Sequence, residues 1–358
     1  MAAEVPYEHI WEIGMRVLVT GHEGYLGSVL VPRLLAAGHE VVGLDVGLFA
    51  DCVIGPAPAD VPAIRTDLRD VTADQLRDAR IEAVVHLAAI CNDPIGNLNP
   101  ELTYEVNHRS TLRLARAAKQ AGATRFLFSS SCSLYGKGAD DAPLDETAGF
   151  NPVTPYGESK ILSEQGLLEL ADDDFSPTFL RNATAYGFSP RLRGDLVVND
   201  LVGHALHTGE VRLQSDGTAW RPLVHADDIA HAFEALLSVD RSRIHAKAYN
   251  IGRTTENYLI RDVANLVRDL VGGTVTFAEG AGTDLRNYRV TCDLIAAEVP
   301  EFQPRWTVAK GIEQLVEAYR RNGLALEDLM GERHQRLKRI TALTAAGRLD
   351  TELRWVSA

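Results

Sequence analysis

Cysteine is scarce in this sequence and nowhere clustered. The 358 residues include four cysteines, Cys52, Cys91, Cys132 and Cys292. They form no CxxC pair, and no cysteine and histidine residues stand together at the spacing of metal ligands. This excludes a disulfide framework and a structural zinc site, so we expect no metal. Widely spaced, reduced cysteines are typical of an enzyme in the cytoplasm.

Long apolar runs and an excess of basic charge are also missing. The longest apolar runs, such as residues 83–90, are far shorter than the ~18 residues of a membrane span. Residues 1–14 contain acids and a proline, where an export signal has a basic region followed by an apolar one. The 36 Lys and Arg against 49 Asp and Glu give a net charge of −13, which counts against nucleic-acid binding. We therefore expect neither a membrane nor a nucleic acid as a partner.

What the chain does contain is an alternation of short β-branched runs and longer helical stretches. The runs predict strands over 16–20, 40–45, 83–89 and 125–131, and the stretches predict helices over 28–37 and 107–121. Such alternation indicates an α/β fold with a Rossmann-type doubly wound parallel sheet.

The length suggests about two domains. We expect a Rossmann domain over 15–175 that carries the candidate catalytic residues. Beyond about residue 176 the alternation loosens, so 176–323 is expected to form mainly a smaller C-terminal α/β substrate lobe, with some segments returning to the core. Residues 324–358 are rich in charge and predict a helical C-terminal tail.

A glycine-rich segment, TGHEGYLG at residues 20–27, follows the first predicted strand and opens a helix. Gly21 permits a tight turn, Gly24 lets the backbone approach a diphosphate, and Gly27 permits close helix–strand packing. Asp45 ends the second predicted strand, near the offset at which a carboxylate binds the adenine-ribose hydroxyls of a dinucleotide. A carboxylate there repels a 2′-phosphate, so the expected cofactor is NAD and not NADP.

A second motif, TPYGESK at residues 154–160, contains a tyrosine and a lysine one helical turn apart. Thr154 is a candidate N-cap and Pro155 a candidate first helical residue. Tyr156 and Lys160 then lie on one face of the helix. A neighbouring ammonium favours the phenolate of a tyrosine, whose free pKa is ~10. The pair therefore suits the reversible deprotonation of an alcohol.

Several motifs together resemble one family. They are TGHEGYLG, Asp67–Leu68, HLAA at 86–89, FSSSCSLYG at 128–136 and PYGESK at 155–160. Over residues 15–320 the chain resembles the extended short-chain dehydrogenase/reductase superfamily, in particular its NAD-dependent nucleotide-sugar epimerase/dehydratase branch. The resemblance implies that Ser131, Tyr156 and Lys160 are catalytic. Ser131 would polarise the substrate oxygen, and Lys160 would hold the nicotinamide ribose.

The resemblance also extends the expected NAD site beyond the glycine turn. That site consists of Gly21, Gly24, Tyr25, Leu26, Gly27, Asp45, Asp67, Leu68, Leu87, Ala88, Ala89, Asn107, Tyr156 and Lys160. Within it, Asp67 and Leu68 are expected to contact adenine, and Asn107 to support the active-site backbone. For His86 we expect a packed strand residue without chemistry.

The nucleotide-sugar substrate is expected against residues that belong mainly to the second lobe. By resemblance these are Ser133, Thr184, Asn199, Arg221, Asp284 and Arg286. Thr184 stands where relatives carry an Asn, and Ala281 stands where many carry an Arg, a loss that Arg286 can offset. The planar guanidinium of Arg221 suits a diphosphate. Uridine, thymidine, guanosine and cytidine diphosphate sugars all remain open.

The residues after the catalytic hydroxyl distinguish branches of the family. The 4,6-dehydratases carry an Asp and a Glu there, whereas this chain has Cys132 and Ser133. Neither is a ready carboxylate for water elimination, which counts against a dehydratase. Cys132 has two interpretations, a catalytic thiol and a buried small side chain, and the second is the commoner for cysteine.

These expectations combine into an NAD-dependent nucleotide-sugar epimerase, acting at C4 by transient oxidation to a keto-sugar and return of the hydride. Alternatives within the family are an NDP-keto-sugar reductase and an NDP-uronate decarboxylase. A non-catalytic NAD-binding protein on the same fold is the alternative from another class. The resemblance further implies a homodimer.

Overall fold

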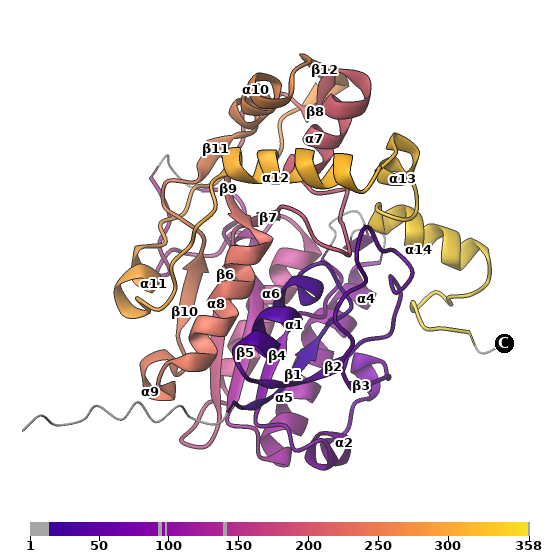
Figure 1. Ribbon diagram of the computed structural model, residues 1–358. Coiled ribbons are helices and arrows are strands. Elements are labelled where there is room, and N and C mark those ends of the chain that lie inside the picture. Colours follow the sequence, from indigo (N-terminus) through magenta and orange to yellow (C-terminus); the bar gives the residue numbers. More distant parts are fainter. Residues whose placement is uncertain (1–13, 92–94, 97–98, 139–141, 357–358) are drawn as a thin grey trace, which may run out of the picture.

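The computed structural model describes residues 14–91, 95–96, 99–138 and 142–356, and a parallel sheet forms its centre. The strands of this sheet are β1 (Arg16–Thr20), β2 (Glu40–Leu44), β3 (Ala63–Ile64), β4 (Ala83–His86), β5 (Arg125–Ser131), β6 (Ser176–Asn182) and β10 (Ala248–Ile251). All their pairings are parallel, in the order β10-β6-β5-β4-β1-β2-β3 (Figure 1). This order, which starts in the middle and grows outward to both edges, confirms the doubly wound Rossmann-type fold.

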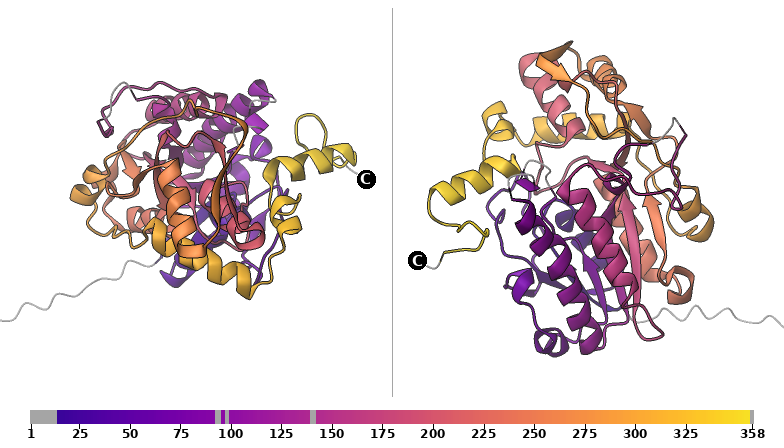
Figure 2. Two further views of the ribbon diagram at one scale, coloured as in Figure 1. Left: turned by 90° about the horizontal axis from the view of Figure 1, so that it is seen from above. Right: turned by 180° about the vertical axis from the view of Figure 1, so that it is seen from behind.

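Helices cover both faces of the sheet because successive side chains of a strand point to opposite sides (Figure 2). Val17 of β1 packs in one apolar cluster with α1 (Gly27–Ala36) and α8 (Ala226–Ser238). Its neighbour Leu18 packs on the other face with α5 (Ser110–Ala121). That second layer also contains α2 (Ala73–Asp78) and α6 (Pro155–Leu168). Burial on both faces explains why β1 reads as a continuous apolar run.

A smaller lobe lies above the carboxyl ends of the strands (Figure 1). Its two sheets consist of β7 (Thr184–Tyr186), β9 (Trp220–His225) and β11 (Asn257–Leu259), and of β8 (Glu210–Ser215) with β12 (Thr274–Gly282). One apolar cluster joins them to α7 (Val197–Thr208), α10 (Ile260–Val271) and α12 (Val308–Arg321). Shorter helical segments are Leu68–Asp70, α4 (Pro100–Tyr104), a π-helix at Glu105–Arg109, Cys132–Tyr135, α9 (Arg241–Ile244) and α11 (Asp293–Glu298).

Segments from beyond residue 175 return to the central core. The strands β6 and β10 complete one edge of the seven-stranded sheet, and α8 packs against α1. We propose a division of the chain at 15–175, 176–323 and 324–358, with β6, β10 and α8 belonging in space to the first part.

The C-terminal extension, residues 324–358, is only partly helical. It contains α13 (Leu326–Met330) and α14 (Arg336–Ala345), and after Gly347 the chain turns back to a bridge between Leu349 and Trp355. Gly347 has φ +67°, the left-handed conformation that ends many helices. The prediction of a helical tail is therefore wrong for 346–356. Within the described ranges, no helix is both long and apolar enough to cross a membrane.

Other predicted boundaries also shift. The helix expected over 107–121 starts at Ser110 as an α-helix, because the preceding turn is a π-helix that includes Asn107. The strand expected over 83–89 ends at His86, where the chain leaves the sheet toward the cleft. The strands at 16–20 and 125–131 have the predicted bounds.

A buried ion pair ties α6 to the sheet. The Arg181 guanidinium of β6 donates to Glu164 of α6, with Nη2 at 2.8 Å from Oε2 and Nε at 3.1 Å from Oε1. Both side chains are 7% exposed, and the Ser130 hydroxyl donates to the same carboxylate at 2.5 Å. Because Glu164 lies one turn beyond Lys160, this pair fixes the helix that carries Tyr156 and Lys160.

Breaking this pair should destabilise the protein strongly. In Glu164→Gln the Arg181 charge stays buried without a counterion, so we expect the free energy of unfolding to fall by about 3–5 kcal/mol. Urea unfolding followed by circular dichroism measures the loss. Glu317→Gln is the matched control, since Glu317 meets Arg321 at the surface with 73% and 65% exposure, and should change stability by less than ~0.5 kcal/mol. Equal, small effects of the two variants would contradict the assigned role of the buried pair.

Candidate active site

The glycine turn after β1 has the backbone that its sequence predicts. Gly21 has φ +71°, which favours glycine, and a Cβ at Gly27 would lie only 2.3 Å from the Gly21 carbonyl oxygen. A side chain at Gly27 would push α1 away from this turn, and one at Gly21 would meet the Ala88 backbone at 3.0 Å. The turn therefore presents bare backbone at the start of α1, as a dinucleotide diphosphate requires.

One continuous cavity of about 980 Å³ connects the glycine turn with the second lobe. It brings together nearly all of the predicted site residues. Those that line it are Gly21, Gly24, Tyr25, Leu26, Gly27, Asp45, Asp67, Leu68, Leu87, Ala88, Ala89, Ser131, Ser133, Tyr156, Lys160, Thr184, Arg221, Asp284 and Arg286. The two predicted residues that do not line it are Asn107 and Asn199. One cavity thus contains the residues predicted for the dinucleotide and most of those predicted for the nucleotide sugar.

Asp45, which the sequence predicts at the adenosine of the cofactor, lines the cavity. It follows β2, and backbone N–H groups of Gly47 and Glu23 donate to its carboxylate at 2.9 and 3.2 Å. Burial raises the pKa of Asp45 above its ordinary value, although these N–H groups oppose the shift. The carboxylate is thus held in one orientation, with free acceptor capacity for the hydroxyls of a ribose.

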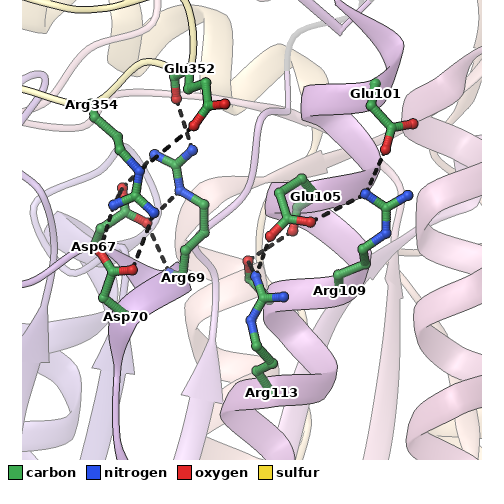
Figure 3. A network of polar contacts seen from close by, with 10 residues as sticks. Asp67, Arg69, Asp70, Glu101, Glu105, Arg109, Arg113, Glu352 and Arg354 are labelled. Carbon is green, nitrogen blue, oxygen red and sulfur yellow. Dashed lines mark hydrogen bonds and ion pairs between the residues drawn. The ribbon is translucent and has the colours of Figure 1, made fainter.

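Asp67 is already engaged by neighbouring cations. Its carboxylate accepts from the Arg69 backbone N–H at 2.8 Å and from the Arg69 guanidinium at 2.6 and 2.8 Å, and Arg354 approaches it from the C-terminal extension (Figure 3). Burial raises the pKa of Asp67, but the hydrogen bonds from Arg69 outweigh it and hold this pKa below its ordinary value. Asp67 therefore fixes the shape of the adenine end as well as lining it.

Tyr156 and Lys160 lie at the first turns of α6. The Thr154 hydroxyl accepts from the Gly157 N–H at 3.2 Å, so Thr154 is the predicted N-cap and Pro155 the first helical residue. Lys160 Nζ lies 5.6 Å from the centre of the Tyr156 ring. The ammonium is 3% exposed and donates to the Ser129 carbonyl at 2.7 Å. Burial lowers the pKa of Lys160 to about 8.

Ser131 ends β5 beside this pair. Its hydroxyl oxygen accepts from the Ser133 N–H at 3.1 Å, and the two serine hydroxyls are hydrogen-bonded to each other. Cys132 points the other way, is fully buried, and donates from Sγ to the Arg181 carbonyl at 3.1 Å. Burial raises the pKa of the Cys132 thiol well above its ordinary value. These observations support the interpretation of Cys132 as a buried small side chain, whereas Ser131 and Ser133 line the cavity.

Asn107 lies outside the cavity and bonds to residues next to it. Its side-chain oxygen accepts from the Ile90 N–H at 2.7 Å, and its amide donates to the Ile90 carbonyl at 3.0 Å and to Ser159 at 3.2 Å. The π-helix that contains Asn107 is a local departure of the kind often found at functional sites. Asn107 thus couples the segment after β4 to the catalytic helix without touching the cavity.

Asn199 does not reach the cavity. It is fully buried in α7, where its side chain accepts from the Gly187 N–H at 2.9 Å and donates to the Gly187 and Arg193 carbonyls at 3.2 and 3.0 Å. The expectation of a substrate contact at Asn199 is not met because backbone groups already occupy its amide. One turn earlier, Asp195 lines the cavity instead.

The far end of the cavity is cationic. Arg221, 4% exposed, pairs with the Asp284 carboxylate at 2.5 Å, and Arg286 meets the same carboxylate at 3.1 Å. Two guanidinium groups thus share one carboxylate, so the cluster carries a net positive charge. This arrangement suits the diphosphate of a nucleotide sugar.

His86 is a buried, packed strand residue, as expected. The side chain lies between the Thr20 and Thr111 hydroxyls at 2.6 and 2.7 Å, and burial lowers its pKa to about 3. Across the described ranges, no group of histidine, cysteine and carboxylate side chains could hold a metal ion.

Sequence reasoning missed several residues of the cavity wall. They include Arg193, Asp195, Arg336, Glu352 and Leu353. Two features explain the omission. Arg193 and Asp195 belong to no recognised motif, and the others come from the C-terminal extension, which lies far along the chain from the glycine turn.

Comparison with known proteins agrees with this geometry. Residues 17–252 match the model of the NAD dependent epimerase/dehydratase family. The UDP-glucose 4-epimerase of Mycolicibacterium smegmatis is 31% identical over 322 residues, which cover 86% of this chain and 99% of that protein. The UDP-glucose 4-epimerase of Bacillus subtilis is 27% identical, over 84% of this chain and 94% of that protein.

Solved structures match along the same length. The NAD complex of the UDP-glucose 4-epimerase of Thermus thermophilus has a TM-score of 0.73 and 28% identity, covering 86% of this chain and 99% of that one. MoeE5 in complex with UDP-glucuronic acid and NAD gives the same TM-score, identity and coverage. The chain belongs to the NAD dependent epimerase/dehydratase family. It is an NAD-dependent enzyme, as the glycine turn and Asp45 predict.

Removing the Asp45 carboxylate should weaken NAD binding. Asp45→Ala deletes a charged acceptor for the ribose hydroxyls, so we expect the Kd for NAD to rise roughly 10- to 100-fold. Discrimination against NADP should fall at the same time. Calorimetric titration of each nucleotide measures both. Asp60→Ala, at an exposed acid in the same β2–β3 connection, should bind NAD like the wild type.

The charge on Lys160 should give the reaction an alkaline limit. With a lowered pKa of about 8, the ammonium is present below that pH and is lost as the pH rises through it. A neutral lysine no longer favours the Tyr156 phenolate. We therefore expect kcat to fall above about pH 8, as measured in a pH profile with folding checked at each pH. A kcat that keeps rising above that pH would contradict this role of the charge.

Proposed function

We propose that this protein is an NAD-dependent epimerase of a nucleotide diphosphate sugar, acting at C4 of the sugar. One observation carries the proposal. Ser131, Tyr156 and Lys160 line one cavity together with the glycine turn and Asp45, which suit a dinucleotide, and with Arg221 and Arg286, which suit a sugar diphosphate. The relatives named UDP-glucose 4-epimerase make UDP-hexoses the first substrates to test.

The residues divide the chemistry among them. NAD, held by the glycine turn and Asp45, would supply the acceptor and donor of the hydride that the sugar carbon loses and regains. Tyr156 takes the proton of the sugar hydroxyl as the hydride leaves, and gives it back after the keto-sugar has turned over. Ser131 hydrogen-bonds the same oxygen. Lys160 keeps a positive charge near the tyrosine, which lowers the free energy of its phenolate.

The sugar nucleotide is held by the second lobe. Arg221 and Arg286 supply the charge for its diphosphate, with Asp284 orienting both guanidinium groups. Ser133 and Thr184 line the same cavity. Because the diphosphate is anchored by the arginines, the keto-sugar can rotate about it and present its other face.

The residues after Ser131 favour an epimerase over a dehydratase. Elimination of water needs an acid and a base at the sugar, and the chain offers a buried thiol at Cys132 and a hydroxyl at Ser133. A keto-sugar reductase or a uronate decarboxylase would use the same oxidation-reduction residues, and analysis of the products separates these reactions.

We also propose that the protein acts as a homodimer in the cytoplasm. All four cysteines are free thiols, as is usual in a reducing compartment. The dimer follows from the family resemblance and is tested by light scattering of the purified protein.

Substitution of the proposed base should abolish turnover and spare the cofactor. In Tyr156→Phe we expect kcat with UDP-glucose or UDP-galactose to fall roughly 10²- to 10⁴-fold, because the proton acceptor is gone. NAD content after denaturation should stay near the wild-type level. Tyr258→Phe is the control, since its hydroxyl bonds Glu256 at 3.1 Å outside the cavity.

Product analysis completes the test. Interconversion of the two sugars with no net NADH supports the epimerase. Consumption of added NADH with a keto-sugar would instead assign a reductase, and release of CO₂ from a UDP-uronate a decarboxylase. Full activity of Tyr156→Phe would overturn the proposed chemistry.

A further inference from the structure

The C-terminal extension forms part of the cofactor cavity. Figures 1 and 2 show α14 and the segment that follows it on the β2 and β3 side of the molecule, beyond α12 and α13. Arg336, at the start of α14, lines the same cavity as Gly21 and Asp45. Glu352 and Leu353, near its end, do so too.

Arg336 is a buried cation with an incomplete set of partners. Its side chain is 5% exposed, and its guanidinium lies 3.8 Å from the centre of the Phe49 ring. Nη2 donates to the Arg191 carbonyl at 3.2 Å, whereas Nη1 is buried and has no hydrogen-bond partner among the residues that the structure describes. Leaving a buried charged N–H unpaired is costly, so the side chain is poised for an acceptor that enters the cavity.

The charge around Arg336 points to an anion. Arg193 lies within electrostatic range, and its own guanidinium is occupied by Asp195, with Nε–Oδ1 at 2.9 Å and Nη2–Oδ2 at 3.1 Å. Arg191 donates to the Ala50 carbonyl and brings no carboxylate. Burial, with the charge of Arg193, lowers the pKa of Arg336 to about 10. In this buried part of the cavity lining, the single carboxylate of Asp195 therefore faces the guanidinium groups of Arg193 and Arg336.

The position of the pair selects the anion. The Phe49 ring, against which the Arg336 guanidinium packs, belongs to the connection that begins at Asp45. Asp45 is the residue expected at the adenosine. Arg193 donates to Sγ of Cys91, in the segment after β4, at 3.4 Å. Its charge also acts on Tyr25 of the glycine turn. The two arginines thus line the cavity together with the glycine turn and the loop after Asp45, the region in which a dinucleotide has its diphosphate. The substrate arginines form a separate group at Asp284.

We propose that Arg336 of the C-terminal extension, together with Arg193, binds the diphosphate of NAD and so makes the extension a wall of the cofactor site. The guanidinium supplies a planar pair of donors that matches phosphate oxygens. The diphosphate carries the negative charge that Asp195 alone does not provide.

Further contacts hold the extension over the adenosine half of the site. The Glu352 carbonyl accepts from Arg69 at 2.9 Å, and Trp355 Nε1 donates to the Val46 carbonyl at 2.6 Å. Arg354 forms two bonds to Asp70, at 2.5 and 3.1 Å (Figure 3). These contacts join the extension to the segments that follow β2 and β3.

The test compares two charge-removing variants of α14. Arg336→Met keeps the apolar stem and removes the guanidinium, and Lys338→Met removes an exposed charge two residues further along. The full-length proteins are assayed for bound NAD after dialysis, for the rate at which NAD exchanges with isotopically labelled NAD, and for binding of ADP-ribose, adenosine and UDP.

In Arg336→Met we expect NAD exchange to be faster and the Kd for ADP-ribose to rise, each roughly 10- to 100-fold. Adenosine and UDP, which do not present the NAD diphosphate, should bind as to the wild type. Lys338→Met should match the wild type throughout. Arg336→Lys, which keeps a point charge without the planar fork, should lie between the two and serves if the Met variant does not fold.

Two outcomes would overturn the proposal. Unchanged ADP-ribose binding with weakened UDP binding would assign Arg336 to the sugar nucleotide. Unchanged binding of both by folded Arg336→Met and Arg336→Lys would show that no diphosphate meets this side chain. Because every readout is a binding measurement, the result does not depend on which sugar reaction the enzyme performs.

Discussion

The parallel register of the central strands is the constraint on which the site depends. Thr20 of β1 stands opposite His86 of β4, and His86 opposite Phe128 of β5, so the chain leaves all three strands at the same edge. The glycine turn, the cavity-lining segment after β4 and Ser131 all lie at that edge. A slip of one residue would send the alternating side chains to the wrong faces and separate these groups.

Buried charge is the second organising feature, and it is used in two ways. Where the fold must be rigid, a buried cation is paired with its own carboxylate, as Arg181 of β6 is with Glu164 of α6. Where a ligand is to bind, carboxylates are too few, as at Arg221 with Arg286 and at Arg193 with Arg336. The difference lets the protein fold around strong internal pairs and still reserve positive charge for two diphosphates.

Local sequence was enough to predict the groups that act through backbone conformation or helical spacing. The left-handed Gly21, the cap at Thr154 and the one-turn separation of Tyr156 and Lys160 are set by residues close to one another in the chain. The burial of Cys132 was harder to predict from sequence, because it depends on the packing of the segment after β5 against α8. The expectation for Asn199 was not met for a similar reason, since its amide is bonded to the Gly187 N–H and to the Gly187 and Arg193 carbonyls of a loop that only tertiary packing brings near.

The sequence by itself determined the Rossmann-type order, the NAD preference and the family, since each rests on short motifs whose chemistry is local. Tertiary structure alone decided how the cofactor cleft is closed. Arg336 and Glu352 lie more than 300 residues beyond Gly21 in the chain, yet they share one cavity wall with it. No periodicity or motif encodes that meeting, because it depends on how α14 docks on the loops after β2 and β3.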